Sequence, residues 1–156
     1  MSLIKVKEYF KQYNMENRII ELNESSATVA DAAHALCCEE KEIAKSLAFK
    51  LEDKVIMIVT AGDAKIDNAK YKAYFKHKAA MLKFDEVEIL VGHAVGGVCP
   101  FAINDNIKVY LDVSLKRFKY VYPACGSTNS AIKLTLEELE KYSNYINWVD
   151  VCKDWN

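Results

Sequence analysis

Residues 44–60, AKSLAFKLEDKVIMIVT, contain two β-rich runs, 44–51 and 55–60, joined by three polar residues. Two such runs with so short a polar connection predict a β-hairpin. Gly62 follows and ends the second strand. The hairpin is the longest strand pair that the sequence predicts, and the remaining elements are considered around it.

Shorter segments on both sides of the hairpin predict further strands and several helices. Helices are predicted where apolar residues recur at helical spacing, most of them after a capping residue: 3–13, 29–36 after Thr28, 68–75 after Asp67 or Asn68, 86–91 after Asp85, a turn at 114–117, and 136–142 after Thr135. Strands are predicted at 18–22, 108–112, 119–122, 131–134 and 147–151. Because strands outnumber helices and several are joined by short turns, we predict an α+β fold. We expect a mixed, largely antiparallel sheet with surrounding helices, and residues 1–156 as a single domain.

The composition is that of an ordinary globular protein. Of the 156 residues 51% are hydrophobic, and no stretch approaches the roughly 18 apolar residues that a membrane span needs. The first ten residues carry Lys5, Lys7 and Glu8 and lack the apolar core of a signal peptide. We therefore expect a cytoplasmic protein with no membrane partner.

The net charge of −1 argues against non-specific nucleic-acid binding by bulk charge. A nucleic-acid partner would need a local patch, and six lysines with His77 lie within residues 65–83, interleaved with Tyr71, Tyr74 and Phe75. The alternative is a solvated helix whose aromatic side chains face the core. The pattern favours this second interpretation.

Residues 96–101, GGVCPF, form a loop that no long apolar run covers. Glycine permits positive φ and lets the backbone approach a ligand closely, while proline fixes φ. The amides of such a turn can converge on a carboxylate, a phosphate or a developing oxyanion. A Gly-Gly pair before proline is also an ordinary structural turn, so both interpretations stay open at this point.

Lys45 stands at the entrance to the apolar run 47–49 of the first hairpin strand. A lysine inside a buried strand is costly unless its ammonium has a partner. Facing a cleft, it can hold a phosphate or a carbonyl oxygen. On the solvent face of an alternating strand it would have no such role, and the pattern does not decide between the two placements.

The chain has five cysteines, at Cys37, Cys38, Cys99, Cys125 and Cys152. Their spacing contains no C-x-x-C, which argues against a zinc site and against a disulfide framework. Cys99 and Cys125 lie in loops, where a nucleophilic thiol would need an activating base, and His93 is the nearest histidine to Cys99. A cysteine-dependent hydrolase is therefore kept as a rival interpretation. The sequence contains no nucleophile elbow, Walker A motif or dinucleotide-binding fingerprint.

Four sequence blocks follow one another along the chain: residues 44–47 (AKSL), 60–63 (TAGD), 92–101 (GHAVGGVCPF) and 124–127 (ACGS), with IKL at 132–134. In this order and spacing they resemble the YbaK/EbsC family of aminoacyl-tRNA deacylases. That family is similar to the editing domain inserted in bacterial prolyl-tRNA synthetases. The resemblance extends from about residue 25 to residue 145.

The resemblance implies a site between these blocks. Lys45 would contact the substrate ester or the terminal adenosine, and the amides of Gly96 and Gly97 would engage the aminoacyl carbonyl. The substrate-binding positions implied in the same way are Ser46, Val98, Cys99, Pro100, Cys125, Gly126 and Ser127. The family uses no metal, and we expect no cofactor, because its chemistry relies on backbone groups, bound water or the substrate itself.

The implied function is hydrolysis of the ester bond of a mischarged aminoacyl-tRNA, with a small amino acid such as Cys or Ala on tRNA-Pro as the expected substrate. The partner is then aminoacyl-tRNA, through its terminal adenosine and amino acid, and an aminoacyl-tRNA synthetase is a further candidate partner. Ala124 and Ala131 stand where members that hydrolyse cysteinyl-tRNA often carry polar residues, and Cys99 stands where serine is common. These departures concern the identity of the amino acid. The alternative function is a non-catalytic module that binds aminoacyl-tRNA or a nucleotide.

Overall fold

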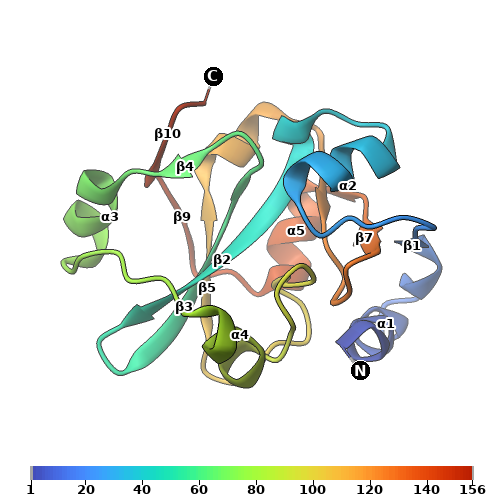
Figure 1. Ribbon diagram of the computed structural model, residues 1–156, viewed down its shortest axis with the longest axis horizontal. Helices are drawn as coiled ribbons and strands as arrows, with labels where there is room; N and C mark the ends of the chain where they lie inside the picture. The colour runs from blue at the N-terminus through green and yellow to red at the C-terminus, as the bar shows by residue number, and fades with distance from the viewer. Residues whose placement is uncertain (1, 156) are drawn as a thin grey trace.

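A six-stranded mixed sheet lies at the centre of the computed structural model, which describes residues 2–155 (Figure 1). Its strands, in spatial order, are β8 (Leu134–Thr135), β6 (Tyr120–Pro123), β2 (Ile43–Leu51), β3 (Lys54–Ala61), β5 (Lys108–Asp112) and β9 (Asn147–Val149). The two longest, β2 and β3, form the predicted hairpin in the middle of the sheet. This position follows from their composition, because β3 is fully buried from Ile56 onward and needs cover on both faces.

The hairpin turn is tighter than the sequence predicts. Leu51 pairs with Lys54, so only Glu52 and Asp53 form the loop. Glu52 has a φ of 60°, the left-handed conformation that two-residue hairpin turns use. Lys54, which we expected in the loop, is the first residue of β3.

Parallel and antiparallel pairs are combined in this sheet. The pairs β2–β3 and β6–β8 are antiparallel, whereas β2–β6, β3–β5 and β5–β9 are parallel. Two small sheets add the antiparallel pairs β1 (Ile19–Glu21) with β7 (Ser130–Ile132) and β4 (Lys65–Ile66) with β10 (Cys152–Lys153). The predicted α+β fold with a mixed sheet is confirmed. The expectation of a largely antiparallel sheet is not met in the six-stranded sheet, where three of the five pairs are parallel, and antiparallel pairs predominate only when the two small sheets are included.

Five α-helices surround the sheet within the described residues: α1 (Ser2–Lys11), α2 (Val29–Leu36), α3 (Asn68–Phe75), α4 (Phe84–Val91) and α5 (Leu136–Ser143). Short 3₁₀ turns are η1 (Glu16–Arg18), η2 (Glu40–Glu42) and η3 (Val113–Arg117). Thr28, Asp67 and Thr135 accept hydrogen bonds from the first turns of α2, α3 and α5, so their predicted roles as N-caps are confirmed. None of these helices has both the length and the apolar character needed to cross a membrane.

The start of α4 differs from the prediction. The helix begins at Phe84, and Asp85 lies inside its first turn instead of capping it. The Glu86 carboxylate accepts a hydrogen bond of 2.9 Å from the Lys83 N–H, which satisfies the group just before the helix. Glu86 therefore fixes the start of α4 two residues earlier than the sequence pattern indicates.

The lysine-rich segment 65–83 contributes its aromatic rings to the core. Tyr71 and Phe75 of α3 are buried, and Tyr71 packs on Phe49 of β2 with ring centroids 5.2 Å apart. Lys70 pairs with Asp150 at 3.1 Å. The arrangement is that of a solvated helix with its aromatic face turned inward, the interpretation that the pattern favoured.

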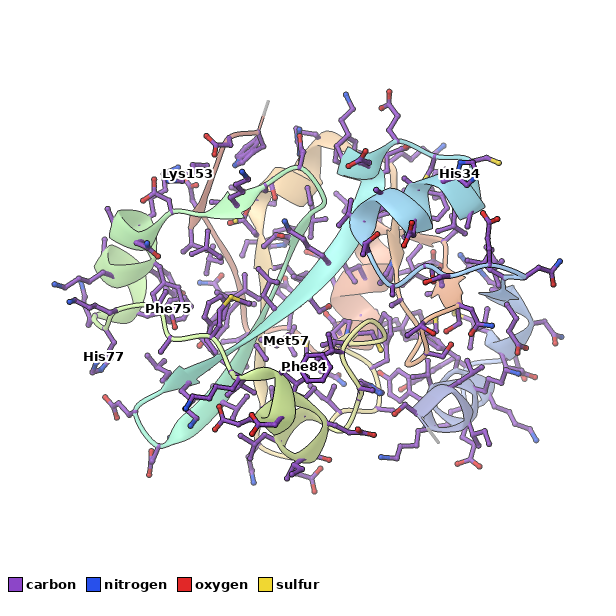
Figure 2. All side chains as sticks on the ribbon, viewed as in Figure 1. His34, Met57, Phe75, His77, Phe84 and Lys153 are labelled. Carbon is purple, nitrogen blue, oxygen red and sulfur yellow. The ribbon has the colours of Figure 1, made fainter. Side chains whose placement is uncertain are left out.

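A separate small apolar cluster holds α2 against the sheet. Ala32 and Ala33 of α2 pack with Ile43 at the start of β2, and Tyr122 of β6 lies against them. The main core, by contrast, is built on β2, β3 and β5 and includes Met57, which Figure 2 shows in the interior. The small side chains of α2 leave space beside β2, and the candidate site lies there.

Candidate active site

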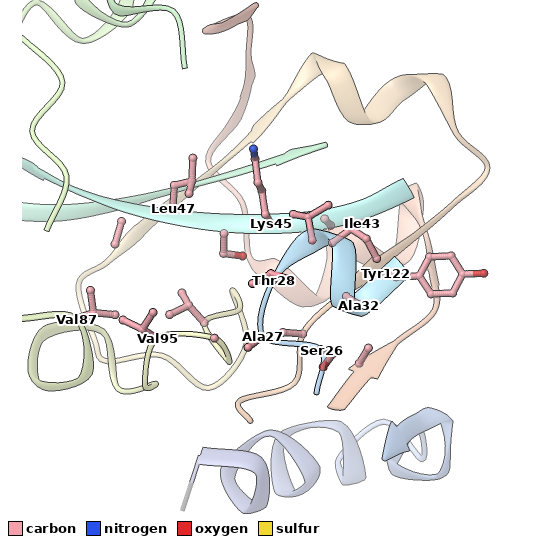
Figure 3. Close-up of a pocket in the computed structure, with 18 of the residues that line it drawn as sticks. Ser26, Ala27, Thr28, Ala32, Ile43, Lys45, Leu47, Val87, Val95 and Tyr122 are labelled. Atoms are coloured by element: carbon pink, nitrogen blue, oxygen red, sulfur yellow. The ribbon is translucent and has the colours of Figure 1, made fainter. Parts of the chain in front are cut away.

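A cavity of about 360 Å³ opens beside β2 (Figure 3). Residues 43–48 of β2 form one wall, and residues 26–29 at the start of α2 form the next. The start of α4 and the loop that follows α4 complete the enclosure, and the end of β6 with β7 closes its far side. Four segments that are distant in sequence therefore meet at one strand edge.

The cavity lies against the part of the β2 edge that has no strand partner within residues 2–155. β6 pairs with β2 only at Ile43 and Ala44. Farther along, Ala48 O accepts from Leu82 N at 3.0 Å and Lys50 N donates to Ala80 O at 2.8 Å. Between these contacts lies Ser46, and because the direction of backbone groups alternates along a strand, its N–H and C=O face the same side as those of Ala48 and Lys50. The Ser46 N–H and C=O thus face the cavity at this edge of β2.

The Ser46 side chain adds a third polar group. Its Oγ is buried and forms no hydrogen bond with any residue of 2–155. Alternation places it on the same face of β2 as Ala44 and Ala48, which are almost fully buried. A buried hydroxyl without a partner costs about 1–3 kcal/mol. Such a group is kept at a cost in stability and is available to hydrogen-bond a ligand.

Lys45 is half-buried at the same edge. Its Nζ lies 3.5 Å from Gly62 O, the outer limit of a hydrogen bond. Burial lowers the pKa of Lys45, while the nearby Cys152 and Asp63 oppose that shift. In Figure 3 the Lys45 side chain points away from Thr28 and Val95. The residue therefore lines the cavity with its stem, and its ammonium lies on the opposite face of β2 from Ser46.

Few ionisable side chains reach the cavity. Among the described residues that line it, only Lys45 and Tyr122 can titrate, and the pKa of Tyr122 is raised by burial. The histidines do not gather there, since His34 and His77 lie at opposite sides of the molecule in Figure 2. Within residues 2–155 no three His, Cys, Asp or Glu side chains form a group that could hold a metal. The cavity offers mostly backbone groups and hydroxyls for chemistry.

The two glycines of the predicted amide nest have different roles in the structure. Gly96 lines the cavity with a φ of 96°. Gly97 lies outside the lining, and its N–H donates to Ala94 O at 3.0 Å, so this amide is engaged in a turn. A Cβ on Gly97 would lie 2.6 Å from the backbone of Gly126 and Ser127. The structure thus corrects the expectation for Gly97, whose small size allows two loops to pack.

Cys99 and Cys125 are completely buried and do not line the cavity. Burial raises the pKa of Cys99 to about 12 and also raises the pKa of Cys125 strongly. The Cys99 Sγ is 3.5 Å from His93 Nε2, but that nitrogen is 2.6 Å from Phe101 O. A carbonyl only accepts, so Nε2 carries the proton and cannot serve as a base for the thiol. The geometry therefore does not support the cysteine-hydrolase interpretation.

The predicted site residues divide into two groups. Lys45, Ser46, Gly96 and Val98 meet at the cavity. The others lie outside its lining, and they are Gly97, Cys99, Pro100, Cys125, Gly126 and Ser127. Ser127 contacts a residue of the lining, because its Oγ lies 2.6 Å from the Oγ of Ser130.

Sequence reasoning missed several residues that line the cavity: Thr28, Met81, Phe84, Tyr122 and Ser130. Thr28 carried a clear signal, but as a helix cap. Phe84 could have been noticed as a large aromatic residue next to charged ones, between Lys83 and Asp85. Tyr122 and Ser130 carried no distinct pattern. Ala124 and Ala131, which drew attention as departures, do line the cavity and form an isolated β-bridge.

Residues 23–142 match the family model of the aminoacyl-tRNA editing domain. The chain is 54% identical over 156 residues to the uncharacterized protein YwhH of Bacillus subtilis (strain 168), with 99% of each chain covered. It is 30% identical over 114 residues to proline–tRNA ligase of Thermosipho melanesiensis, a match that covers 72% of this chain but only 20% of the ligase.

Comparison with solved structures supports the same relationship. A protein proposed as a trans-editing enzyme for prolyl tRNA synthetase superposes with a TM-score of 0.87 at 26% identity, and the match covers 97% of both chains. The predicted fold class and the resemblance in the four sequence blocks are thereby confirmed. The chain belongs to the aminoacyl-tRNA editing domain family.

Proposed function

We propose that this protein hydrolyses the ester bond between a mischarged amino acid and the terminal ribose of a tRNA. One observation carries the proposal: among residues 2–155, the cavity combines a stretch of β2 backbone without a strand partner, a buried Ser46 hydroxyl without a hydrogen-bond partner, and Gly96 on the facing loop. These groups suit a small polar ester enclosed by apolar walls. Membership of the editing-domain family supports the choice of substrate class.

Hydrolysis of the ester passes through a tetrahedral oxyanion. Backbone or hydroxyl donors placed at that oxygen contribute on the order of 3 kcal/mol each in comparable sites. The Ser46 N–H and Oγ and the Gly96 amide are the candidate donors here. The Lys45 stem lines the cavity, and its ammonium on the other face of β2 has only a long contact with Gly62 O. In this proposal the side chain gives up that contact and turns its charge towards a substrate oxygen at the cavity edge.

No carboxylate, imidazole or thiol lines the cavity among the described residues. The attacking water must then be activated by the backbone, by another water or by a hydroxyl of the substrate ribose. The same observation favours the second candidate function, a module that binds aminoacyl-tRNA without hydrolysing it. The two functions differ in one measurable outcome, the release of free amino acid.

The expected amino acid is small, such as Cys or Ala, carried on tRNA-Pro. Ala124, Ala131, Ala44 and Ala48 line the cavity and leave a smooth apolar surface. The similarity to proline–tRNA ligases supports tRNA-Pro and an association with a synthetase. The protein would act in the cytoplasm, where aminoacyl-tRNA is used.

The test is incubation with a panel of aminoacyl-tRNAs, each carrying a radiolabelled amino acid, with release measured against a blank. Ile89→Ala serves as a control variant, because Ile89 is exposed on α4 and does not line the cavity. Accelerated release of at least one amino acid by both proteins supports the hydrolase. Binding of the panel without acceleration supports the binding module.

A further inference from the structure

Exposed apolar side chains gather at the mouth of the cavity. Nine large hydrophobic residues are exposed within residues 2–155, and three of them line this one cavity: Met81 (57% exposed), Phe84 (79%) and Val95 (43%). Phe84 is the most exposed of all nine. Burying such a ring elsewhere would stabilise the protein by about 1.5–3 kcal/mol, so its exposure beside a polar-edged cavity points to a ligand.

The Phe84 side chain projects from a firmly held element. It is the first residue of α4, and Val87 and Val91 on the same helix are buried. Glu86 joins α4 to β2 through an ion pair of 2.6 Å with Lys50. Within the described residues the Phe84 ring has no stacking partner and no cation over its face. A fixed aromatic ring with an open face is therefore presented at the cavity mouth.

The charges beside Phe84 narrow the choice of ligand. Asp85 and Glu88 are exposed on α4, the charge of Glu86 is offset by Lys50, and Lys83 is the nearest additional cation in sequence. A phosphate chain running along this helix would meet more negative than positive charge. An uncharged planar group is the better match, and a nucleobase has two such faces.

We propose that Phe84 stacks on the adenine of the terminal adenosine whose aminoacyl ester occupies the cavity. This inference rests on the proposed function, because adenine and ester are carried by the same ribose. With the ester at Ser46 and Gly96 inside the cavity, the base lies at the mouth, where Met81 and Phe84 are exposed. Stacking on an aromatic ring needs no charge and fits the surface described above.

The test uses titration calorimetry to measure binding of a non-hydrolysable analogue, in which an amide joins the amino acid to the 3′-nitrogen of 3′-amino-3′-deoxyadenosine. A second analogue keeps the amide and the ribose but lacks the base. Phe84→Ala should weaken binding of the adenine-containing analogue by about fivefold to a hundredfold, the range found when base-stacking aromatics are replaced by alanine. Phe84→Trp should retain the affinity. Ile89→Ala, which changes a residue of similar exposure (77% against 79%), should match the wild type.

Binding of the base-free analogue distinguishes stacking of Phe84 on the base from a role of Phe84 in the shape of the cavity. Equal binding of this analogue to wild type and Phe84→Ala supports stacking on the base. Equal loss for both analogues overturns the inference, because Phe84 would then only shape the cavity. An unchanged affinity of Phe84→Ala for the adenine analogue overturns it as well. Failure of the proposed function is seen separately, as a wild-type protein that releases no amino acid from any aminoacyl-tRNA.

Discussion

At the scale of single residues, Ser46 is the most direct test of the site, because its buried hydroxyl has no partner within residues 2–155. Ser46→Ala removes an unsatisfied group, so the melting temperature should stay the same or rise. Single-turnover deacylation should fall about tenfold, which corresponds to roughly 1.4 kcal/mol of lost transition-state stabilisation.

Ser130→Ala is the matched control for Ser46→Ala. Ser130 is also a buried serine at the cavity, but its Oγ is hydrogen-bonded to Ser127 Oγ at 2.6 Å. Its removal should therefore destabilise the protein by about 0.5–1.5 kcal/mol. If Ser46→Ala melts as early as Ser130→Ala, the Ser46 hydroxyl has a structural partner and its assignment to the substrate is wrong.

Lys45 gives a second prediction at this scale. Lys45→Met keeps the aliphatic stem and removes a charge that burial disfavours, so the variant should be at least as stable as wild type. Because burial lowers the pKa of Lys45 below its ordinary value of 10.5, the ammonium loses its proton at a lower pH than a free lysine.

The pH profile of Lys45→Met separates a role in catalysis from a role in packing. The wild-type rate, corrected for uncatalysed hydrolysis, should decline on the alkaline side as the ammonium is lost. Lys45→Met should be slow at every pH and lack this decline. A folded variant with wild-type activity would remove Lys45 from the site.

At the scale of elements, the contact between the two glycine loops holds one side of the cavity in place. Gly126 N donates to Gly97 O at 2.9 Å, and a Cβ on Gly97 would lie 2.6 Å from backbone atoms of the other loop. Gly97→Ala should therefore cost about 1–3 kcal/mol of stability through overpacking, measured by urea unfolding. Deacylation should fall with it, because Gly96 and Val98 lining the cavity are displaced. Full stability in this variant would contradict the packing described here.

Most helices and strands could be predicted from interactions between residues close together in the sequence. The hairpin and the caps at Thr28, Asp67 and Thr135 follow from rules that act within a few residues, and all are confirmed. The start of α4 was misplaced because Asp85 and Glu86 are both acceptable near a helix start, and only the Lys83 N–H to Glu86 bond decides between them. The strands β4 and β10 have two residues each, too few for a periodic pattern.

The candidate site was only partly predictable for a related reason. Lys45, Ser46, Gly96 and Val98 stand in recognisable blocks, and the structure brings them to one cavity. The engagement of the Gly97 amide depends on a hydrogen bond to Ala94 that no spacing rule reveals. Phe84 and Ser130 reach the cavity through tertiary contacts between segments far apart in the chain, which a single sequence does not encode in any local pattern.

At the scale of the whole molecule, stability should depend on pH through His93. This side chain is fully buried. Its Nε2 is hydrogen-bonded to the Phe101 carbonyl, and its Nδ1 has no hydrogen-bond partner within residues 2–155. Burial lowers the pKa of His93, the Phe101 hydrogen bond opposes the shift, and the positive charge of Lys5 lowers the pKa further. The unfolded chain then takes up the proton first as pH falls.

The free energy of unfolding should consequently decrease as pH falls below about 6.5, the ordinary pKa of histidine, towards the lowered pKa of folded His93. Carboxylates whose pKa is lowered, such as Asp63 and Glu138, lose their contribution only in more acidic solution. Urea unfolding at about pH 7.5 and about pH 5.5 measures the His93 effect. Replacing the exposed His34 and His77 by glutamine should leave the difference in unfolding free energy between the two pH values unchanged. Loss of that difference in the variant would assign the pH dependence to His34 or His77 instead of His93.

Single-turnover deacylation of alanyl- and cysteinyl-tRNA-Pro shows whether the cavity beside β2 cleaves an aminoacyl ester. Wild type and Ile89→Ala should release at least one of these amino acids well above the blank, while a folded Lys45→Met/Ser46→Ala variant should release it at the blank rate. Release by the double variant as fast as by wild type would place the chemistry elsewhere. A wild-type rate equal to the blank for both substrates and for the remaining aminoacyl-tRNAs of the panel would contradict the hydrolase altogether.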